Sequence, residues 1–161
     1  MGKVLQEAQG VLGSVCAQVL RQLEQHCGIP KGQLKASITE QGINFLRYGV
    51  GQSWGEFHWD YLGGQYGNIL ICLQAGGTGG WTFMDCGGLK FQLASGQAAA
   101  WVNYNSEGKL VRESCHAAGS VYSGDERYVV SVKVLRAGFK APAREQLRCM
   151  ANAVFPCVKN L

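Results

Sequence analysis

Several classes of protein are excluded by what this sequence of 161 residues lacks. Its seven cysteines are odd in number, widely spaced and without a Cys-x-x-Cys pair, which argues against a zinc ribbon and a disulfide scaffold. No dense Lys/Arg tract accompanies the net charge of +4, so charge does not indicate a nucleic-acid partner. No run of about 18 apolar residues is present, and Gln6, Glu7 and Gln9 interrupt any apolar region of a secretory signal. We therefore expect a cytoplasmic protein with reduced thiols, no membrane association and no nucleic-acid partner.

The composition is that of one globular domain rich in tight turns. Apolar residues make up 47% of the chain and charged residues 16%, which is typical of a folded protein and not of a disordered one. The sequence has 23 glycines and only three prolines, as expected of a small β-rich core. Because this length suits one domain, we assign residues 1–161 to a single domain.

Hydrophobic periodicity divides this domain into three parts. A helix is predicted over about residues 3–27, because apolar residues recur at helical spacing until Gly28 and Pro30 end the segment. A core over about 33–137 follows, and a closing helix over about 141–153 has Pro142 early in its first turn. The strands predicted within the core are 34–38, 43–48, 68–73, 82–84, 89–92, 98–104 and 128–135.

Glycine-rich breaks separate these strands. The run Gly76–Gly80 lacks the following Lys-Ser/Thr of a phosphate-binding loop, so we expect it to turn a hairpin. The sum predicts a mostly β protein whose core is a double-stranded β-helix, or jelly roll, flanked by N- and C-terminal helices.

The chain has only three histidines, and two of them fit one metal-binding pattern. His58 and Asp60 are two residues apart, so on a strand they point to the same face. His116 is the remaining histidine placed to complete the set, because His26 falls at the end of the predicted helix and is interpreted as a surface or capping residue. Two imidazoles and one carboxylate on one face of an octahedron are the ligand set of non-heme Fe(II) oxygenases.

The sequence around these residues resembles a known family in five segments. Residues 46–61 read LRYGVGQSWGEFHWDY and resemble R-Y-x-x-G-Q-x-Y/W followed by H-x-D-Y/F, the motif that opens the catalytic core of prolyl 4-hydroxylase-type Fe(II)/2-oxoglutarate oxygenases. Residues 69–74 resemble the following core strand, and residues 79–83 (GGWTF) resemble the G-G-x-T-x-F motif. Residues 95–102 resemble the G-x-A-x-x-F strand, and residues 115–124 (CHAAGSVYSG) resemble H-A-G-x-P-V-x-x-G. The resemblance covers about residues 44–136.

This resemblance implies roles for five residues. His58, Asp60 and His116 would be the iron ligands, and Arg127 would pair with the distal carboxylate of 2-oxoglutarate, which a planar guanidinium can hold with two hydrogen bonds. Tyr48 matches a tyrosine that faces 2-oxoglutarate in this family. The implied cofactors are Fe(II), 2-oxoglutarate as co-substrate and O2, with succinate and CO2 as co-products. No catalytic residue beyond the iron ligands is implied.

Two departures from the family pattern affect the co-substrate site. The segment Gly124-Asp125-Glu126-Arg127 has one acidic residue more than the usual pattern and Arg in place of Lys. A tyrosine found on the next core strand in some members is absent near Cys72 and Gln74. The alternative interpretation of Arg127 is a strand-edge arginine paired with Asp125 or Glu126.

Aromatic residues near the motifs are candidates for the substrate pocket. These candidates are Trp54, Trp59, Tyr61 and Trp101. Trp81 is a further one, although a tryptophan on a strand more often packs in the core. Cys115 lies next to His116 and is expected to point to the opposite face and pack in the core.

Three functions remain open at this point. The first is a hydroxylase of an unactivated C–H bond in a prolyl-type peptide, a free amino acid or another small molecule. The second is a demethylase of alkylated nucleobases with the same fold, which the weak basic character disfavours. The third is a catalytically silent barrel that binds a ligand or partner, against which the three intact ligand positions argue. The substrate, the position hydroxylated and the oligomeric state are left open.

Overall fold

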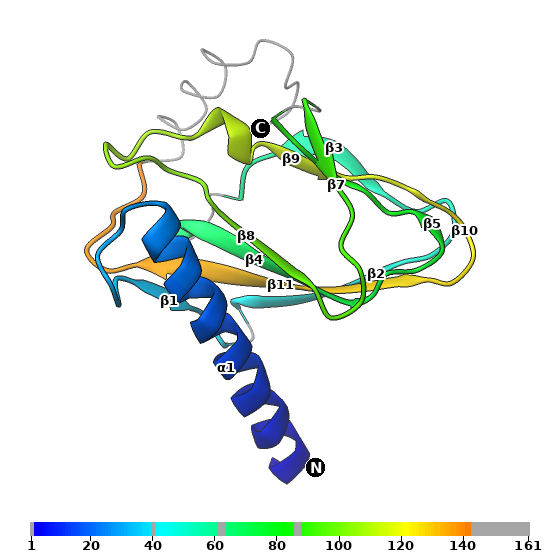
Figure 1. The fold of residues 1–161 in the computed structure, drawn as a ribbon, viewed down its shortest axis with the longest axis horizontal. Helices are drawn as coiled ribbons and strands as arrows, with labels where there is room; N and C mark the ends of the chain where they lie inside the picture. Colours follow the sequence, from blue (N-terminus) through cyan, green and yellow to red (C-terminus); the bar gives the residue numbers. More distant parts are fainter. Residues whose placement is uncertain (1, 40, 61–63, 86–87, 143–161) are drawn as a thin grey trace.

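The protein consists of two facing β-sheets with one long helix against the outer face of the larger sheet (Figure 1). The structure is a computed structural model and describes residues 2–39, 41–60, 64–85 and 88–142. No helix in this part of the chain has the length and hydropathy that a membrane span requires. The elements, in chain order, are α1 (Gly2–His26), β1 (Leu34–Ala36), β2 (Ile43–Tyr48), β3 (Trp54–His58), β4 (Gly67–Gln74), β5 (Thr78–Gly79), β6 (Thr82–Met84), β7 (Leu89–Phe91), β8 (Ala98–Val102), the 3-10 helix η3 (Arg112–Ser114), β9 (His116–Ala118), β10 (Val121–Ser123) and β11 (Arg127–Arg136).

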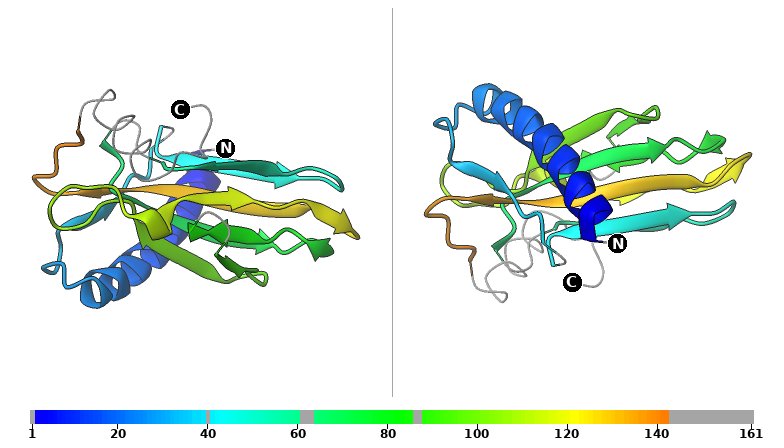
Figure 2. Two further views of the ribbon diagram at one scale, coloured as in Figure 1. Left: turned by 90° about the horizontal axis from the view of Figure 1, so that it is seen from above. Right: turned by 90° about the horizontal axis from the view of Figure 1, so that it is seen from below.

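Helix α1 lies obliquely across the strands of the larger sheet, as the view from below in Figure 2 shows. It ends where Gly28 adopts a φ of +64°, which favours glycine. The carboxylate of Glu24 is only 4% exposed and accepts a hydrogen bond of 2.8 Å from the N–H of Leu34. This bond ties α1 to the start of β1. The buried side chains of α1 in the core cluster are Cys16, Leu20 and Leu23.

The central strands of the larger sheet, β4 and β11, are buried on both faces. The strand order of this sheet is β1-β11-β4-β8, and β2 pairs with β11 on the same side as β1. Side chains along β11 alternate between the faces, so Val130 and Val132 join the cluster with α1, whereas Arg127 and Val129 face the other sheet. Strand β4 also packs against a hydrophobic cluster on each face, so its first six residues, beginning at Gly67, are all buried.

The smaller sheet has the order β3-β9-β6-β7, and β5 pairs with β10 as a separate ribbon. The chain crosses repeatedly between the two sheets: from β2 to β3 and back to β4, from β4 to β6, from β7 to β8, and from β8 to β9 and back to β11. All strand pairs within the two sheets are antiparallel. This is the double-stranded β-helix that the sequence predicts, and the predicted N-terminal helix is confirmed.

The predictions for the glycine run 76–80 and for the C-terminal segment are not confirmed by the described residues. The glycine run 76–80 does not turn a hairpin, because β11 and β8 already occupy both edges of β4. The chain instead crosses to the other sheet, where β5 pairs with β10. The backbone there lies so close to β10 that a Cβ on Gly77 would lie 1.7 Å from the carbonyl oxygen of Ser123. The predicted C-terminal helix over about 141–153 lies outside the described residues except at its first two positions.

Candidate metal centre and co-substrate pocket

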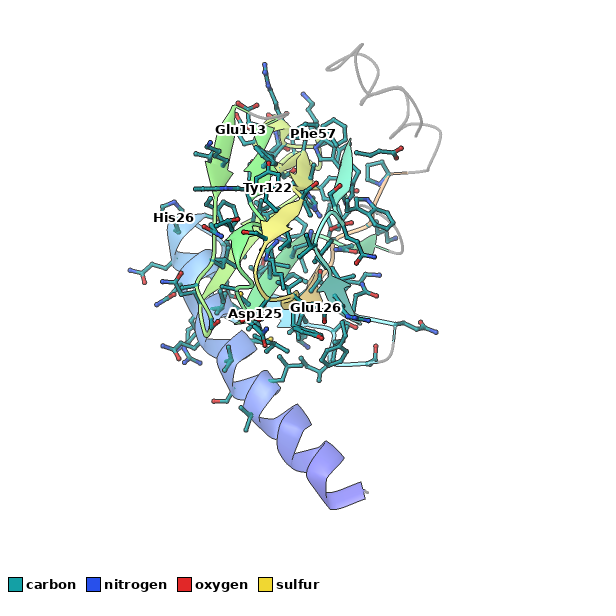
Figure 3. The ribbon with its side chains drawn as sticks, turned by 90° about the vertical axis from the view of Figure 1, so that its right-hand side faces the viewer. His26, Phe57, Glu113, Tyr122, Asp125 and Glu126 are labelled. Carbon is teal, nitrogen blue, oxygen red and sulfur yellow. The ribbon has the colours of Figure 1, made fainter. Side chains whose placement is uncertain are left out.

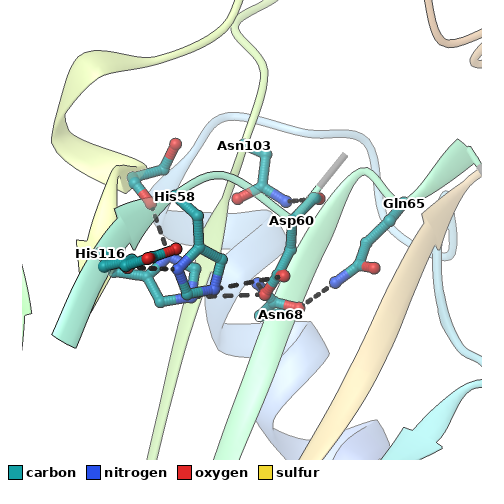
Figure 4. Close-up of polar contacts among 8 residues, drawn as sticks. His58, Asp60, Gln65, Asn68, Asn103 and His116 are labelled. Carbon is teal, nitrogen blue, oxygen red and sulfur yellow. Dashed lines mark hydrogen bonds and ion pairs between the residues drawn. The ribbon is translucent and has the colours of Figure 1, made fainter. Parts of the chain in front are cut away.

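Two strands and the turn after one of them bring His58, Asp60 and His116 together (Figure 4). His58 ends β3 and pairs in register with His116 at the start of β9. Asp60 follows two residues after His58. Its carboxylate oxygens lie 3.7 Å from Nε2 of His58 and 3.3 Å from Nε2 of His116. One potential ligand atom from each residue lies within 4.8 Å of the others, so one metal ion can contact all three.

The two imidazole rings are oriented by backbone carbonyls. Nδ1 of His58 donates to the carbonyl oxygen of Glu56, and Nδ1 of His116 donates to that of Ser114, each at 2.9 Å. In the neutral imidazole a ring nitrogen that donates to a carbonyl carries the proton, so the lone pair is on Nε2. Both Nε2 atoms face the carboxylate, so in that form both lone pairs can be directed at one metal ion.

Three amide side chains hold Asp60 in place. Asn68 donates to Oδ2 of Asp60 at 2.7 Å and in turn accepts a hydrogen bond from Gln65. Asn103 donates to the backbone carbonyl of Asp60 at 2.6 Å. Asn68 and Asn103 are fully buried. These supports were missed from the sequence, although the polar Asn68 within an otherwise apolar strand was a signal.

The protonation of the site suits a cation. Burial acts to raise the pKa of Asp60, but its hydrogen bond and charge interaction with His116, together with His58 and Asn68, outweigh burial and hold the pKa below its usual range. Burial lowers the pKa of His58, and the neighbouring His116 lowers it further. An ionised carboxylate beside a neutral imidazole is the form that binds a metal ion.

The three residues open into a central pocket of about 570 Å³ between the two sheets. This volume is in the range of pockets that hold small-molecule ligands. Tyr48 and Arg127 line it from the larger sheet, and Thr82 lines it from β6. The expected site residues His58, Asp60, His116, Tyr48 and Arg127 thus share one pocket.

Arg127 is a buried cation without an anionic partner among the described residues. The residue is 1% exposed, and its Nε and Nη2 atoms have no hydrogen-bond partner in this part of the chain. The alternative of a surface pair with Glu126 is wrong, because Glu126 accepts hydrogen bonds from Arg47 and Tyr128. Asp125 is exposed. Burying a guanidinium without an anion costs several kcal/mol, so the geometry points to an anion from outside the described residues.

The surroundings of Arg127 form a cradle for such an anion. Arg127 pairs in register with Tyr48, whose ring centre lies 5.9 Å from the guanidinium carbon. Burial raises the pKa of Tyr48, so its hydroxyl keeps its proton and can donate. The buried hydroxyl of Thr82, which lines the same pocket, has no hydrogen-bond partner among the described residues. Gly80 leaves space here, since a Cβ on it would lie 2.9 Å from Cδ of Arg127.

The aromatic candidates have different positions. Trp54 lines the pocket and is 60% exposed, whereas Trp101 lines it deeper and meets the ring of His116 edge-on at 4.9 Å between centroids. The expectation for Trp59 is wrong. Trp59 lies between His58 and Asp60, which face the pocket, so its own side chain points the opposite way. It packs in the core cluster, where its indole N–H donates to the carbonyl of Val111. Tyr61 lies outside the described residues.

Two further expectations concern residues away from the pocket. His26 is exposed at the end of α1, as Figure 3 shows, so its interpretation as a surface residue is confirmed. Cys115 packs in the core cluster as expected. Trp81 does not line the central pocket, and the ammonium of Lys90 lies over its ring at 4.9 Å from the centroid.

No protein-family model and no curated protein sequence matches this chain. Two solved structures of a viral collagen prolyl hydroxylase from Paramecium bursaria chlorella virus 1 are similar. Its complex with 2-oxoglutarate aligns with a TM-score of 0.56 at 19% identity, over 86% of this chain and 73% of that chain. A truncated form aligns with a TM-score of 0.55 at 19% identity, over 86% of this chain and 68% of that chain. A cupin domain from Bordetella pertussis aligns less well, with a TM-score of 0.39 at 14% identity, over 63% of this chain and 90% of that chain. The likeness shows the fold alone.

Proposed function

We propose that this protein is an Fe(II)- and 2-oxoglutarate-dependent dioxygenase that hydroxylates an unactivated C–H bond. The observation that carries the proposal is the buried Arg127, which has no anionic partner among the described residues and lies in the same pocket as the three metal-ligand candidates. A metal site alone fits many functions, and a buried cation alone fits many anions. Together they fit a ligand that coordinates the metal at one end and presents a carboxylate at the other, which describes 2-oxoglutarate.

The residues present fit both groups. His58, Asp60 and His116 supply two imidazole nitrogens and one carboxylate, the set that suits Fe(II) with open positions for further ligands. Arg127 supplies unpaired N–H donors in a planar fork, which matches a carboxylate. When bound, iron and 2-oxoglutarate supply the oxidative chemistry, in which O2 is consumed, succinate and CO2 are released and one oxygen atom enters the substrate.

The chain itself supplies binding, orientation and a dry environment. Carbonyl oxygens fix both histidine rings, and Asn68 fixes Asp60, so the metal would meet a preformed site. The guanidinium of Arg127 and the hydroxyl of Thr82 would hold the distal carboxylate of the co-substrate. The apolar side chains of Leu46, Leu70 and Val129 line the same pocket and keep water from the space between these two ends.

An anaerobic titration with Fe(II) and then 2-oxoglutarate tests this proposal. Chelation of 2-oxoglutarate to Fe(II) is expected to produce a weak visible charge-transfer band at one equivalent of iron. The band should be absent in His58→Ala and His116→Ala. In Arg127→Met the dissociation constant of 2-oxoglutarate should rise about 100-fold, because a charge-assisted pair of about 3 kcal/mol is lost.

The exposed Arg21 on α1 provides a matched control. Arg21→Met should leave the band and its half-saturation unchanged. A wild-type protein that binds iron but gives no band with 2-oxoglutarate would contradict the proposal. It would leave a metal-binding barrel of another function.

A further inference from the structure

The central pocket contains a second cation at the end opposite Arg127. Lys133 lines the pocket from β11, six residues after Arg127 and on the same face of the strand. Six residues of extended strand separate their Cα atoms by about 20 Å. In the register of the larger sheet Lys133 lies opposite Asn68, the residue that holds the metal-ligand candidate Asp60. Lys133 is therefore placed beside the metal centre, on the side away from Arg127.

Lys133 has no acidic partner among the described residues. No ion pair is formed by its ammonium there, whereas the exposed Lys109 pairs with Glu107 at 2.8 Å. Asp60 is the one acidic side chain among the described residues that line the pocket. A divalent metal ion would more than neutralise Asp60, so the charge of Lys133 would stay uncompensated even in the metal-bound protein.

The side chains around Lys133 are neutral hydrogen-bonding groups. Ser131 precedes it on the same face of β11, and Asn44 of β2 pairs with Ser131 in register. Gln41 and Gln65 also line this end of the pocket. One ammonium with hydroxyl and amide neighbours matches a ligand with a single negative charge. A phosphate with nearly two charges is usually held by several cations or a helix N-terminus, which this end does not provide among the described residues.

We infer that the substrate is a small carboxylic acid whose carboxylate is bound by Lys133 while its reacting C–H bond lies at the metal. This inference rests on the proposed function, in which 2-oxoglutarate occupies the Arg127 end. The pocket of about 570 Å³ has room for a second small molecule beside a five-carbon diacid. Lys133 is then a specificity-determining residue, with Ser131 and Asn44 beside it as neutral donors.

Paramagnetic relaxation tests this inference without knowledge of the natural substrate. The 161-residue chain is loaded with Mn(II), saturated with 2-oxoglutarate and titrated with propionate, and the longitudinal relaxation rate of the methyl protons of propionate is measured. We expect a saturable enhancement with propionate and none with propionamide, which has the same shape without the charge. Lys133→Met should raise the dissociation constant of propionate about ten-fold, and Lys133→Arg should restore it.

The controls separate this inference from the proposed function. Lys35→Met, at an exposed lysine of β1, should behave as wild type. The Fe(II)–2-oxoglutarate band in Lys133→Met reports that the variant is folded with its co-substrate site formed. If wild type lacks that band, the proposed function fails. If the band is present but propionate gives no saturable enhancement, or an equal one in Lys133→Met, the inference about Lys133 is overturned. Tighter binding of methylphosphonate than of propionate would also overturn the assignment of a carboxylate.

Discussion

Replacement of Arg127 by methionine should stabilise the ligand-free protein and abolish its stabilisation by 2-oxoglutarate. Arg127 is 1% exposed and two of its nitrogens have no partner among the described residues, so in this part of the ligand-free fold its buried charge is uncompensated. Exchange of buried charged groups for apolar side chains of similar size is often neutral or stabilising by about 1–4 kcal/mol. For a domain of this size each 1 kcal/mol shifts Tm by about 2–4 °C. Arg127→Met should therefore raise Tm of the ligand-free protein by at least about 2 °C.

2-Oxoglutarate should stabilise wild type but not the variant. At 100 times its dissociation constant it stabilises the Mn(II)-loaded wild type by about 2.7 kcal/mol through mass action. The same concentration should add little to Arg127→Met, because its dissociation constant is about 100-fold higher. Thermal unfolding followed by circular dichroism measures Tm of both proteins without ligands, with Mn(II) alone and with Mn(II) and 2-oxoglutarate. The difference between the last two conditions reports 2-oxoglutarate alone.

A loss of thermal stability in the ligand-free variant would refute this reasoning. If Arg127→Met lowers Tm of the ligand-free protein by several degrees, the guanidinium has a structural partner, since removal of one member of a buried pair costs about 3–5 kcal/mol. Arg21→Met is the matched control on the exposed surface of α1 and should change neither value.

Three further predictions follow from other parts of the structure. For Glu24, burial acts to raise the pKa, but three backbone N–H donors and the charge of Lys31 outweigh it and lower the pKa. Its stabilising contribution is therefore complete above the unfolded pKa of about 4.3 and is lost as pH falls through the folded pKa. Glu24→Gln should flatten the dependence of unfolding free energy on pH below about 4.3, and an unchanged dependence would refute this. Asn68→Ala should weaken Mn(II) binding by about 10–100-fold in calorimetry, because the supporting hydrogen bond is lost; an unchanged affinity would show that Asn68 does not position the ligand. Gly80→Ala should destabilise the protein by about 1–2 kcal/mol in urea because φ there is +65°, and it should also weaken 2-oxoglutarate binding because its Cβ would press on Arg127; full retention of both would contradict the cradle.

The fold and the grouping of the site residues were predictable because both follow from local patterns. The 3.6-residue period predicts helix α1. The ordered motifs over about 44–136 resemble those of a jelly-roll family and so imply the fold of the core. The spacing of His58 and Asp60 places both on one face, and β9 brings His116 opposite them. The roles of these residues as iron ligands stay predictions until a metal is measured.

Other features depend on tertiary contacts that no local pattern specifies. The ion-pair partner of Glu126 is Arg47, which is 79 residues distant, so the buried state of Arg127 was not evident from its acidic neighbours. The glycine run 76–80 resembles a hairpin locally, and only the occupied edges of β4 exclude it. Lys133 was not singled out because an isolated lysine on a strand carries no signal of what it faces.

Succinate formation in a single turnover tests the central claim most directly. The anaerobic complex of the protein with Fe(II) and 2-oxoglutarate is exposed to O2, and succinate is quantified by NMR. We predict succinate in proportion to the protein in wild type and Arg21→Met, and none in His116→Ala. Iron-loaded wild-type protein that leaves 2-oxoglutarate unchanged under O2 would contradict the assignment of this pocket to 2-oxoglutarate-dependent oxidation.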